Sequence, residues 1–573
     1  MGTPEEAPTV DAPPPGEPEG APIDWPQCEV EGCIGVQAHE KTRCLAHLPF
    51  GELYPLLEAG LTSIDLRGVP VNSVLLHRVT IALPSEGDVR IAEDCQFDHA
   101  TFTENVHFRS VHFGGSCTFR NVTANGLFTF GFCRFDPKFA VMFSDCTLSK
   151  GITISDSVAL GRLFVASCSA DSVMIKKSRF EGDLIILKIA GEYLFIDECN
   201  GNRISVQDCQ LKRGSLKNSE FESIEAGALS LEESFLLTRA TGTNVRLDAI
   251  TAKDQIVIDQ CEFGGAESIG PLKATESVSL RRSTLTTRRA VAVEGGALDL
   301  TDSRFPEGVT ISTSSREMVL DETHYGRSSL IAGAGDGDQP RLRSTQRADL
   351  ENLALDNVNL GDCEFTNAHN LDALRLRRST FATSPAGVGL HPFRLISRRR
   401  VLLEERLWRS RRGSRGWPTL EGADVAPDAT EIAELYRSLR SGLEQARNEP
   451  GAADFYYGEM EMRRHDRHSS ISEKAILTAY WAFSGYGLRA SRSLSALVAV
   501  VVLFALAFWA VGFQSGDPSS FSSALTYAAG AATFHPPARH LTTSGEALSI
   551  ALRIIGPVLL GLAAFSIRGR VRR

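Results

Sequence analysis

Four residues with metal-binding side chains lie close together near the start of the chain, with the spacing Cys28-x4-Cys33-x10-Cys44-x2-His47. Cysteine sulfur and histidine nitrogen are ligands that Zn²⁺ prefers, and four of them complete a tetrahedral shell. A catalytic zinc keeps one position open, so this set predicts a structural zinc site rather than a catalytic one.

Two alternatives remain at this segment. His39 could replace His47 as the fourth ligand, and cysteines that bind no metal would explain the spacing equally simply. Gly32 and Gly35 would allow tight turns around the second ligand. A bound metal would fold a stretch that is too short to build a hydrophobic core of its own.

Elsewhere the sequence offers little chemistry of the enzymatic kind. It has no G-x-G-x-x-G after a strand, no P-loop, no G-x-S-x-G and no H-E-x-x-H. Glu459 and Glu461 lie two positions apart, and such residues in a helix point about 200° away from each other. They cannot converge on one substrate, so we expect no catalytic residues.

The long middle of the chain follows a five-residue rule. Large apolar residues recur at Leu61, Leu66, Val71, Leu76 and Ile81, each with a second apolar residue two positions earlier. The same register returns at Leu350, Leu355, Leu360 and Phe365. This period is neither helical nor that of a simple strand, and two separated stretches that share it predict a repeat solenoid.

Between these stretches, a small residue, any residue and a large apolar residue recur as a triplet. Phe263, Leu285 and Phe305 are spaced by about twenty residues, which predicts one complete turn of a four-sided coil. Cysteine in the small position behaves as a small hydrophobe, so we expect core packing there rather than redox chemistry. The triplets begin at Cys95, Cys117, Cys133, Ser178, Cys209, Cys261, Ser303 and Ser379.

These residues resemble the pentapeptide-repeat family, whose pattern Ala-Asp/Asn-Leu-x-x is matched closely at Ala348-Asp349-Leu350. The resemblance covers roughly residues 59–381. It implies a mainly β fold, a right-handed quadrilateral β-helix solenoid with the large and the small apolar residues pointing inward.

We therefore expect six regions along the chain. A disordered Pro-rich tail would be followed by the zinc knuckle, the β-helix, an Arg-rich connector, a juxtamembrane helical hairpin with an interfacial helix, and a transmembrane hairpin. These regions cover residues 1–24, 25–50, 51–385, 386–425, 426–492 and 493–573, respectively.

The connector is strongly basic, with nine arginines between Arg394 and Arg415. They would form either a solvated basic helix and loop or a contact with anionic lipid headgroups. A net charge of −10 for the whole chain argues against a dedicated nucleic-acid binder. The residues expected at lipid are Arg398, Arg399, Arg400, Arg411 and Arg412.

Beyond the connector, Asp428 or Thr430 could cap a helix that is broken at Pro450-Gly451, and a second helix is expected from about Ala452. Residues 447–464 resemble the juxtamembrane block of membrane-anchored pentapeptide-repeat proteins of actinobacteria. We expect these helices to pack through aromatic and methionine side chains.

Two apolar stretches are long enough to cross a bilayer, residues 494–513 and 547–567. Trp481, Arg489 and Arg492 flank the first, and Arg568 and Arg570 follow the second. Basic residues on both outer flanks predict that the N- and C-termini are cytoplasmic.

The segment between the two spans, residues 521–534, could re-enter the membrane. Thr533, Phe534 and Arg553 would then line a pore, as in the two-helix module of cation channels, although the potassium-filter sequence is absent. Alternatively, Arg553 snorkels to the interface.

The function favoured by the sequence is a non-enzymatic scaffold or sensor anchored in a bacterial inner (plasma) membrane as a multi-pass protein. It would contact membrane lipid and present the β-helix to an unknown cytoplasmic protein, and it could form a homo-oligomer. One alternative is an oligomeric channel-like protein without a potassium filter, and a second is a membrane-associated oxidoreductase.

Overall fold

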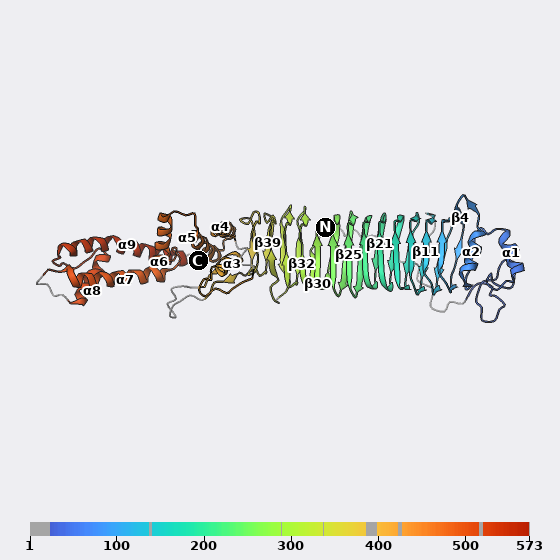
Figure 1. The fold of residues 1–573 in the computed structure, drawn as a ribbon, viewed down its shortest axis with the longest axis horizontal. Helices are drawn as coiled ribbons and strands as arrows, with labels where there is room; N and C mark the ends of the chain where they lie inside the picture. The colour runs from blue at the N-terminus through green and yellow to red at the C-terminus, as the bar shows by residue number, and fades with distance from the viewer. Residues whose placement is uncertain are drawn as a thin grey trace, which may run out of the picture. The chain divides into compact units, whose positions relative to one another are not determined.

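The computed structural model describes residues 23–136, 140–287, 289–335, 337–385, 398–421, 427–514 and 520–571, without the side chains of 566–571. The chain divides into two compact units, Met1–Lys212 and Arg213–Arg573. Strands of both units wind as a parallel β-solenoid, about 13 turns in all (Figure 1). The solenoid predicted from the repeat is therefore present. Nearly all of the predicted tail, residues 1–24, lies outside the described residues.

The first unit opens with helices rather than with a regular coil. Helix α1 (Phe50–Glu58) precedes strands β1 (Ile64–Asp65) and β2 (Pro70–Val71), and helix α2 (Ser73–Ile81) follows them. The five-residue register was thus wrong as a sign of β-structure at Leu76 and Ile81. The Asn72 side chain accepts a hydrogen bond from the Leu75 amide (2.8 Å), which caps α2 and ends the coil there.

One coil of the first unit illustrates the packing. Its strands are β9 (Cys117–Arg120), β10 (Thr123–Ala124), β11 (Phe128–Gly131) and β12 (Arg134–Phe135). Strand β9 pairs in parallel with β13 (Val141–Ser144), so that the rings of Phe119 and Phe143 stack 4.3 Å apart between centroids. Buried phenylalanines of successive coils therefore fill the interior.

Further along the first unit, the short sides of the coil merge into longer strands. These are β20 (Arg179–Leu187), β21 (Ala190–Asp197) and β22 (Asn200–Gln207). Residues at the bends between strands adopt a positive φ, which L-residues rarely do. The bends recur every eleven residues at His99, Ser110, Asn121 and Phe132, and every ten at Lys188, Glu198 and Asp208.

In six of the eight predicted triplets the small residue directly follows such a bend, and Cys95 and Cys117 are the exceptions. At seven corners of the first unit the small residue donates its thiol or hydroxyl hydrogen to the backbone carbonyl two residues earlier, at 2.7–3.5 Å. Cysteine and serine are therefore interchangeable there, because both are small donors. The corners are Cys133, Cys146, Ser157, Cys168, Ser178, Cys199 and Cys209.

The second unit continues with coils of the same kind. Phe263 in β29 (Glu262–Ile269) lies directly beside Leu285 in β31 (Thr284–Thr287). In the next coil, β33 (Arg304–Phe305) pairs with β31. The predicted spacing of one turn is confirmed. The last strand of the large sheet is β40 (Arg375–Arg377), which pairs with β39 (Leu353–Asp356).

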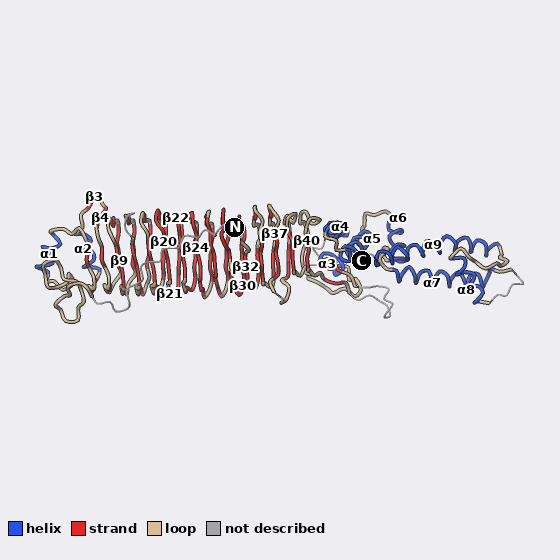
Figure 2. Tube along the Cα trace, turned by 180° about the vertical axis from the view of Figure 1, so that it is seen from behind, coloured by secondary structure: helices blue, strands red, loops and turns tan. Residues whose placement is uncertain are grey.

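Helices of the second unit follow the last coils (Figure 2). A short antiparallel pair, β41 (Ala382–Thr383) and β42 (Arg400–Val401), leads into α3 (Leu403–Arg411). Helices α4 (Ala429–Gln445) and α5 (Glu449–His465) pack on each other, and α6 (Ile471–Ser484) follows. The two predicted helices are present, but the break between them lies at residues 446–448 rather than at Pro450, because proline fits the first turn of α5.

The two apolar stretches are helical. Helix α7 (Ala490–Ala507) ends in a π-helical turn (Phe508–Gly512), and α9 (Thr543–Val571) is the second. The intervening α8 (Phe521–Ala532) packs against both of them. Only 11% and 28% of the two apolar windows are buried inside the protein, unlike the core helices of a soluble domain. Both helices are long and apolar enough to cross a membrane.

Candidate functional site

The four predicted metal ligands come together in the first unit. The ligand atoms of Cys28, Cys33, Cys44 and His47 all lie within 4.8 Å of one another. Nδ1 of His47 is 3.3 Å from Cys44 Sγ and 3.6 Å from Cys28 Sγ, and the Cys33 and Cys44 sulfurs are 3.8 Å apart. His39 is exposed and is not a member of this cluster.

The backbone fixes the position of each ligand. The Cys28 amide donates to the Gly35 carbonyl (2.8 Å) and the His47 amide to the Cys44 carbonyl (2.9 Å). Gly32 has a φ of 77°, as expected of a turn. Gly35 has a different role, because a Cβ there would lie 3.0 Å from the Cys44 Cβ.

Electrostatics also favour a ligand role for Cys28. Burial alone would raise its pKa, but hydrogen bonds from the Cys44 and Val30 backbone and from His47 lower the pKa to about 7. The thiolate, which is the metal-binding form, is therefore accessible near neutral pH. Three sulfurs and one nitrogen can hold a metal ion and leave no open position for catalysis.

Four thiols in the solenoid have the opposite character. Burial raises the pKa of Cys133, Cys199, Cys209 and Cys261 to about 11. They stay protonated and unreactive at neutral pH, and they serve as corner donors.

A second site lies in the second unit, where charged side chains are buried between α3, α4 and α5. Its first centre is Glu405, which is fully buried. The Arg399 guanidinium donates to both of its oxygens (2.6 and 2.7 Å), and the Tyr436 hydroxyl donates to Oε2 (2.6 Å). Arg409 adds a further bond to Oε1 (3.2 Å). Every oxygen of this buried carboxylate thus has strong donors.

The second centre is Glu461 on α5. Arg409 bridges to its Oε1 (3.1 Å), Arg464 donates to the same oxygen (2.8 Å), and the Tyr486 hydroxyl donates to Oε2 (3.1 Å). Burial would raise the pKa of Glu461, but Arg464 and Arg409 lower it to about 2. Arg409 therefore joins the two carboxylates into one network.

The network continues to the start of α7. Arg464 and Arg492 both lie over the Trp481 ring, at 4.4 and 5.0 Å from its centroid. The Arg492 guanidinium also donates to the Trp481 carbonyl (2.9 Å), and the Trp481 indole donates to the Tyr457 hydroxyl (3.1 Å). Such cation–π contacts are strongest when the ring and the cation are desolvated.

At its other end, this block is attached to the last coils of the solenoid. Arg406 donates to the Gly361 carbonyl and to Asp362 (both 2.8 Å), and the Phe365 amide donates to Glu404 (2.5 Å). Helix α4 lies close to the same coils, because a Cβ on Gly442 would be 3.1 Å from the Asp372 carbonyl. The described contacts thus run without interruption from the solenoid end to α7.

The arginines predicted at lipid fall into different environments. Arg399 is buried by Glu405 and cannot contact headgroups, because the connector here is a packed strand and not a free basic loop. Arg398, Arg411 and Arg412 are exposed, while Arg400 and Arg489 are partly buried. The side chains of Arg568 and Arg570 lie outside the described residues.

The residues predicted to line a pore are all exposed. Thr533 and Phe534 directly follow helix α8, and Arg553 lies on α9. Glu459 and Glu461 do not converge, as predicted, since Glu459 pairs with Arg437 and Arg440 instead.

Glu405, Tyr436 and Arg409 were not predicted as site residues. The signal available was a pair of acidic residues, Glu404-Glu405, inside a segment otherwise dominated by arginine. Such a pair next to many cations indicates internal pairing. No family model, curated protein or solved structure matches the chain.

Proposed function

We propose that the protein is a membrane-anchored scaffold or sensor whose solenoid faces the cytoplasm and recruits a protein partner there. Helices α7 and α9 form the anchor, and both termini lie on the cytoplasmic side of a bacterial plasma membrane. The solenoid is proposed to be of the pentapeptide-repeat type, and the Cys28 cluster is proposed to hold a structural zinc ion.

The observation that carries this proposal is the buried network between the last coils and α7. A passive tether needs only a flexible linker, whose side chains make few buried contacts. Here Glu405 and Glu461 are buried with their cations, and losing one partner of a buried ion pair costs about 3–5 kcal/mol. Such a linkage is stiff, so a change at the solenoid end can reach the membrane helix.

The exposed faces of the helices support the anchor. Helix α6 exposes Ile471, Ile476 and Phe483 next to the start of α7, as an interfacial helix would. Along α7, its π-helical turn and α9, most of the exposed large residues are also apolar, with Arg553 as an exception, and apolar side chains suit contact with lipid tails. They include Leu494, Val498, Leu503, Trp509, Ile550, Ile554, Val558 and Phe565.

The experiment is hydrogen exchange on the full chain in detergent, with Glu405→Gln as the variant. Because Glu405 holds Arg399, Arg409 and Tyr436, we expect faster exchange both in α3 and in α5, including amides near Glu461. The expected loss of local stability is about 3–5 kcal/mol.

The matched control is Glu434→Gln, since Glu434 is an exposed glutamate on α4. This control should change exchange only at its own turn, if at all. If Glu405→Gln loosened α3 alone and left α5 unchanged, the block would not be one mechanical element and the sensor proposal would fail.

One observation favours the channel-like alternative. Helix α8 is too short to span a bilayer, yet Ala524, Tyr527 and Ala528 pack it against α7 and α9. Ion flux through liposomes that contain the inserted protein would favour this alternative.

A further inference from the structure

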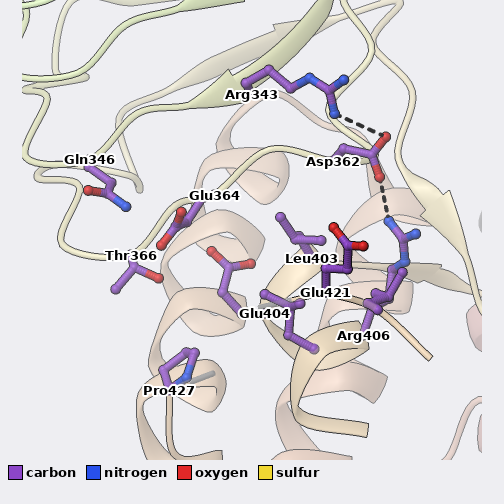
Figure 3. A pocket seen from close by; sticks show the side chains of 12 residues that line it. Arg343, Gln346, Asp362, Glu364, Thr366, Leu403, Glu404, Arg406, Glu421 and Pro427 are labelled. Atoms are coloured by element: carbon purple, nitrogen blue, oxygen red, sulfur yellow. Dashed lines mark hydrogen bonds and ion pairs between the residues drawn. The ribbon is translucent and has the colours of Figure 1, made fainter. Parts of the chain in front are cut away.

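A cavity of about 600 Å³ lies between the last coils of the solenoid and helix α3 (Figure 3). Its volume is in the range of pockets that bind small organic molecules. Residues from two coils line one wall, and α3 with the segment around Glu421 lines the other. Of the described side chains, none needed for the network around Glu405 and Glu461 lies in this wall.

Two buried polar atoms in the wall lack partners in the described part of the chain. Glu404 is fully buried, and its Oε1 accepts from the Phe365 amide while Oε2 has no hydrogen-bond partner. The Thr366 hydroxyl oxygen is also buried without a partner. Unsatisfied buried groups cost free energy, so each of them calls for a ligand or a water molecule.

The charges around these atoms favour a cation. Figure 3 shows Arg343 and Arg406 both directed at Asp362, so the cations of the wall are already paired. The side chains of Glu364 and Glu421 have no ion-pair partner among the residues described. Glu364, Thr366 and Glu404 lie next to one another in the same view. The wall therefore presents surplus negative charge beside two free acceptors.

We propose that this cavity binds a small organic cation whose ammonium group is held by Glu404 and Glu364. A divalent metal ion fits less well, because the wall does not gather three carboxylates around one point. Among the described residues, only the cluster around Cys28 brings three or more metal-binding side chains together.

The position of the cavity would let a bound ligand influence α7 through helix α3. Glu404 and its neighbour Glu405 are consecutive residues of α3, so one faces the cavity and the other faces the buried network. A cation that draws Glu404 toward the cavity would shift α3 and hence Arg399 and Tyr436. This role as the sensor's input rests on the proposed function, whereas the site itself does not.

The test is isothermal titration calorimetry of the full chain in detergent with 1,4-diaminobutane. The uncharged 1,4-butanediol is the matched ligand control, and calcium chloride tests the metal alternative. We expect the diamine to bind and Glu404→Gln to weaken binding at least about tenfold, because the glutamine loses the charge. The glutamine side chain retains an oxygen that accepts from the Phe365 amide. The melting temperature of the variant should therefore equal that of the wild type at acidic pH.

The control variant is Glu351→Gln, an exposed glutamate outside the cavity wall, which should bind the diamine like the wild type. Absence of diamine binding, or equal affinity of the wild type and Glu404→Gln, would overturn the site. Calcium binding that is lost in Glu404→Gln would show that the site takes a metal ion and would contradict the proposal of an organic cation. Binding that leaves exchange in α5 unchanged would support the site and contradict the sensor role.

Discussion

Folding moves the pKa of Glu404 into the neutral range. Burial raises its pKa from an ordinary 4.5 to about 7, and the Glu364 carboxylate acts in the same direction. The folded protein therefore holds a proton that the unfolded chain releases above pH 4.5. The resulting stability is present in full below the unfolded pKa and is lost as the pH rises through about 7.

This behaviour gives a prediction for Glu404→Gln, which mimics the protonated acid. Between about pH 5 and about pH 8, the wild type should lose on the order of 3 kcal/mol of stability relative to the variant. Urea unfolding followed by circular dichroism measures the difference. Arg343, Asp362, Glu364, Arg406 and Glu421 face the group in both proteins, so their effects cancel. Parallel pH curves would contradict the assigned burial.

The burial of an individual arginine could not be predicted from the sequence. Arg398 and Arg399 are adjacent in the sequence and equally basic, yet one is exposed and the other is buried against Glu405. The sequence could not separate them, because their environment depends on Tyr436 and α5, far along the chain. The clustering of Cys28, Cys33, Cys44 and His47 was predictable, since all four lie within one short segment.

The corners of the solenoid need residues that tolerate a positive φ. Asp208 has a φ of 55°, and Cys209 after it donates to the Gln207 carbonyl. A β-branched side chain is strained in that backbone region, so Asp208→Val should cost about 1–2 kcal/mol. Cys209→Ser keeps a small donor and should be nearly neutral. Thermal unfolding of both variants gives the comparison.

The control for this pair is Gln210→Val, because Gln210 is exposed two residues further on, in a strand. Valine suits strands, so this change should be harmless. Equal destabilisation by valine at positions 208 and 210 would mean that the positive φ at position 208 does not restrict which residue can stand there.

Repeat spacing predicted the solenoid but not its ends. Phe263 and Leu285 lie side by side because every coil repeats one geometry, and this is a local rule that the sequence displays. Leu76 satisfies the same spacing but belongs to α2, because the cap at Asn72 starts a helix. The five-residue rule marks the buried residues of regular coils such as Leu350 and Leu355, but Ile81 also obeys it and is exposed, so the rule does not identify where the regular coil gives way to a helix.

The segment around the Cys28 cluster should depend on its metal. We expect one zinc per chain by atomic absorption, and loss of that zinc in Cys33→Ser. Structural zinc supplies about 10–16 kcal/mol to small domains, so a chelator should unfold this segment. Cys209→Ser should retain the metal. Retention of zinc in Cys33→Ser would contradict the assigned ligands.

The proposed anchor requires that α7 and α9 lie in a membrane, with both termini on its cytoplasmic side. The chain carries a net charge of −10, yet basic residues precede α7 and end α9. Both flanks would lie on the cytoplasmic side, where positive residues are favoured. The same orientation puts the solenoid and the Cys28 cluster in a reducing compartment, which suits free thiols.

Reporter fusions can measure on which side of the membrane each segment lies. Alkaline phosphatase, which is active only outside the cytoplasm, would be fused either at the C-terminus or after Gln514, between α7 and α8. We expect phosphatase activity only from the fusion after Gln514, and fluorescence from green fluorescent protein fused at the C-terminus. An active phosphatase at the C-terminus, or a chain that alkaline carbonate releases from membranes, would contradict the proposed anchor.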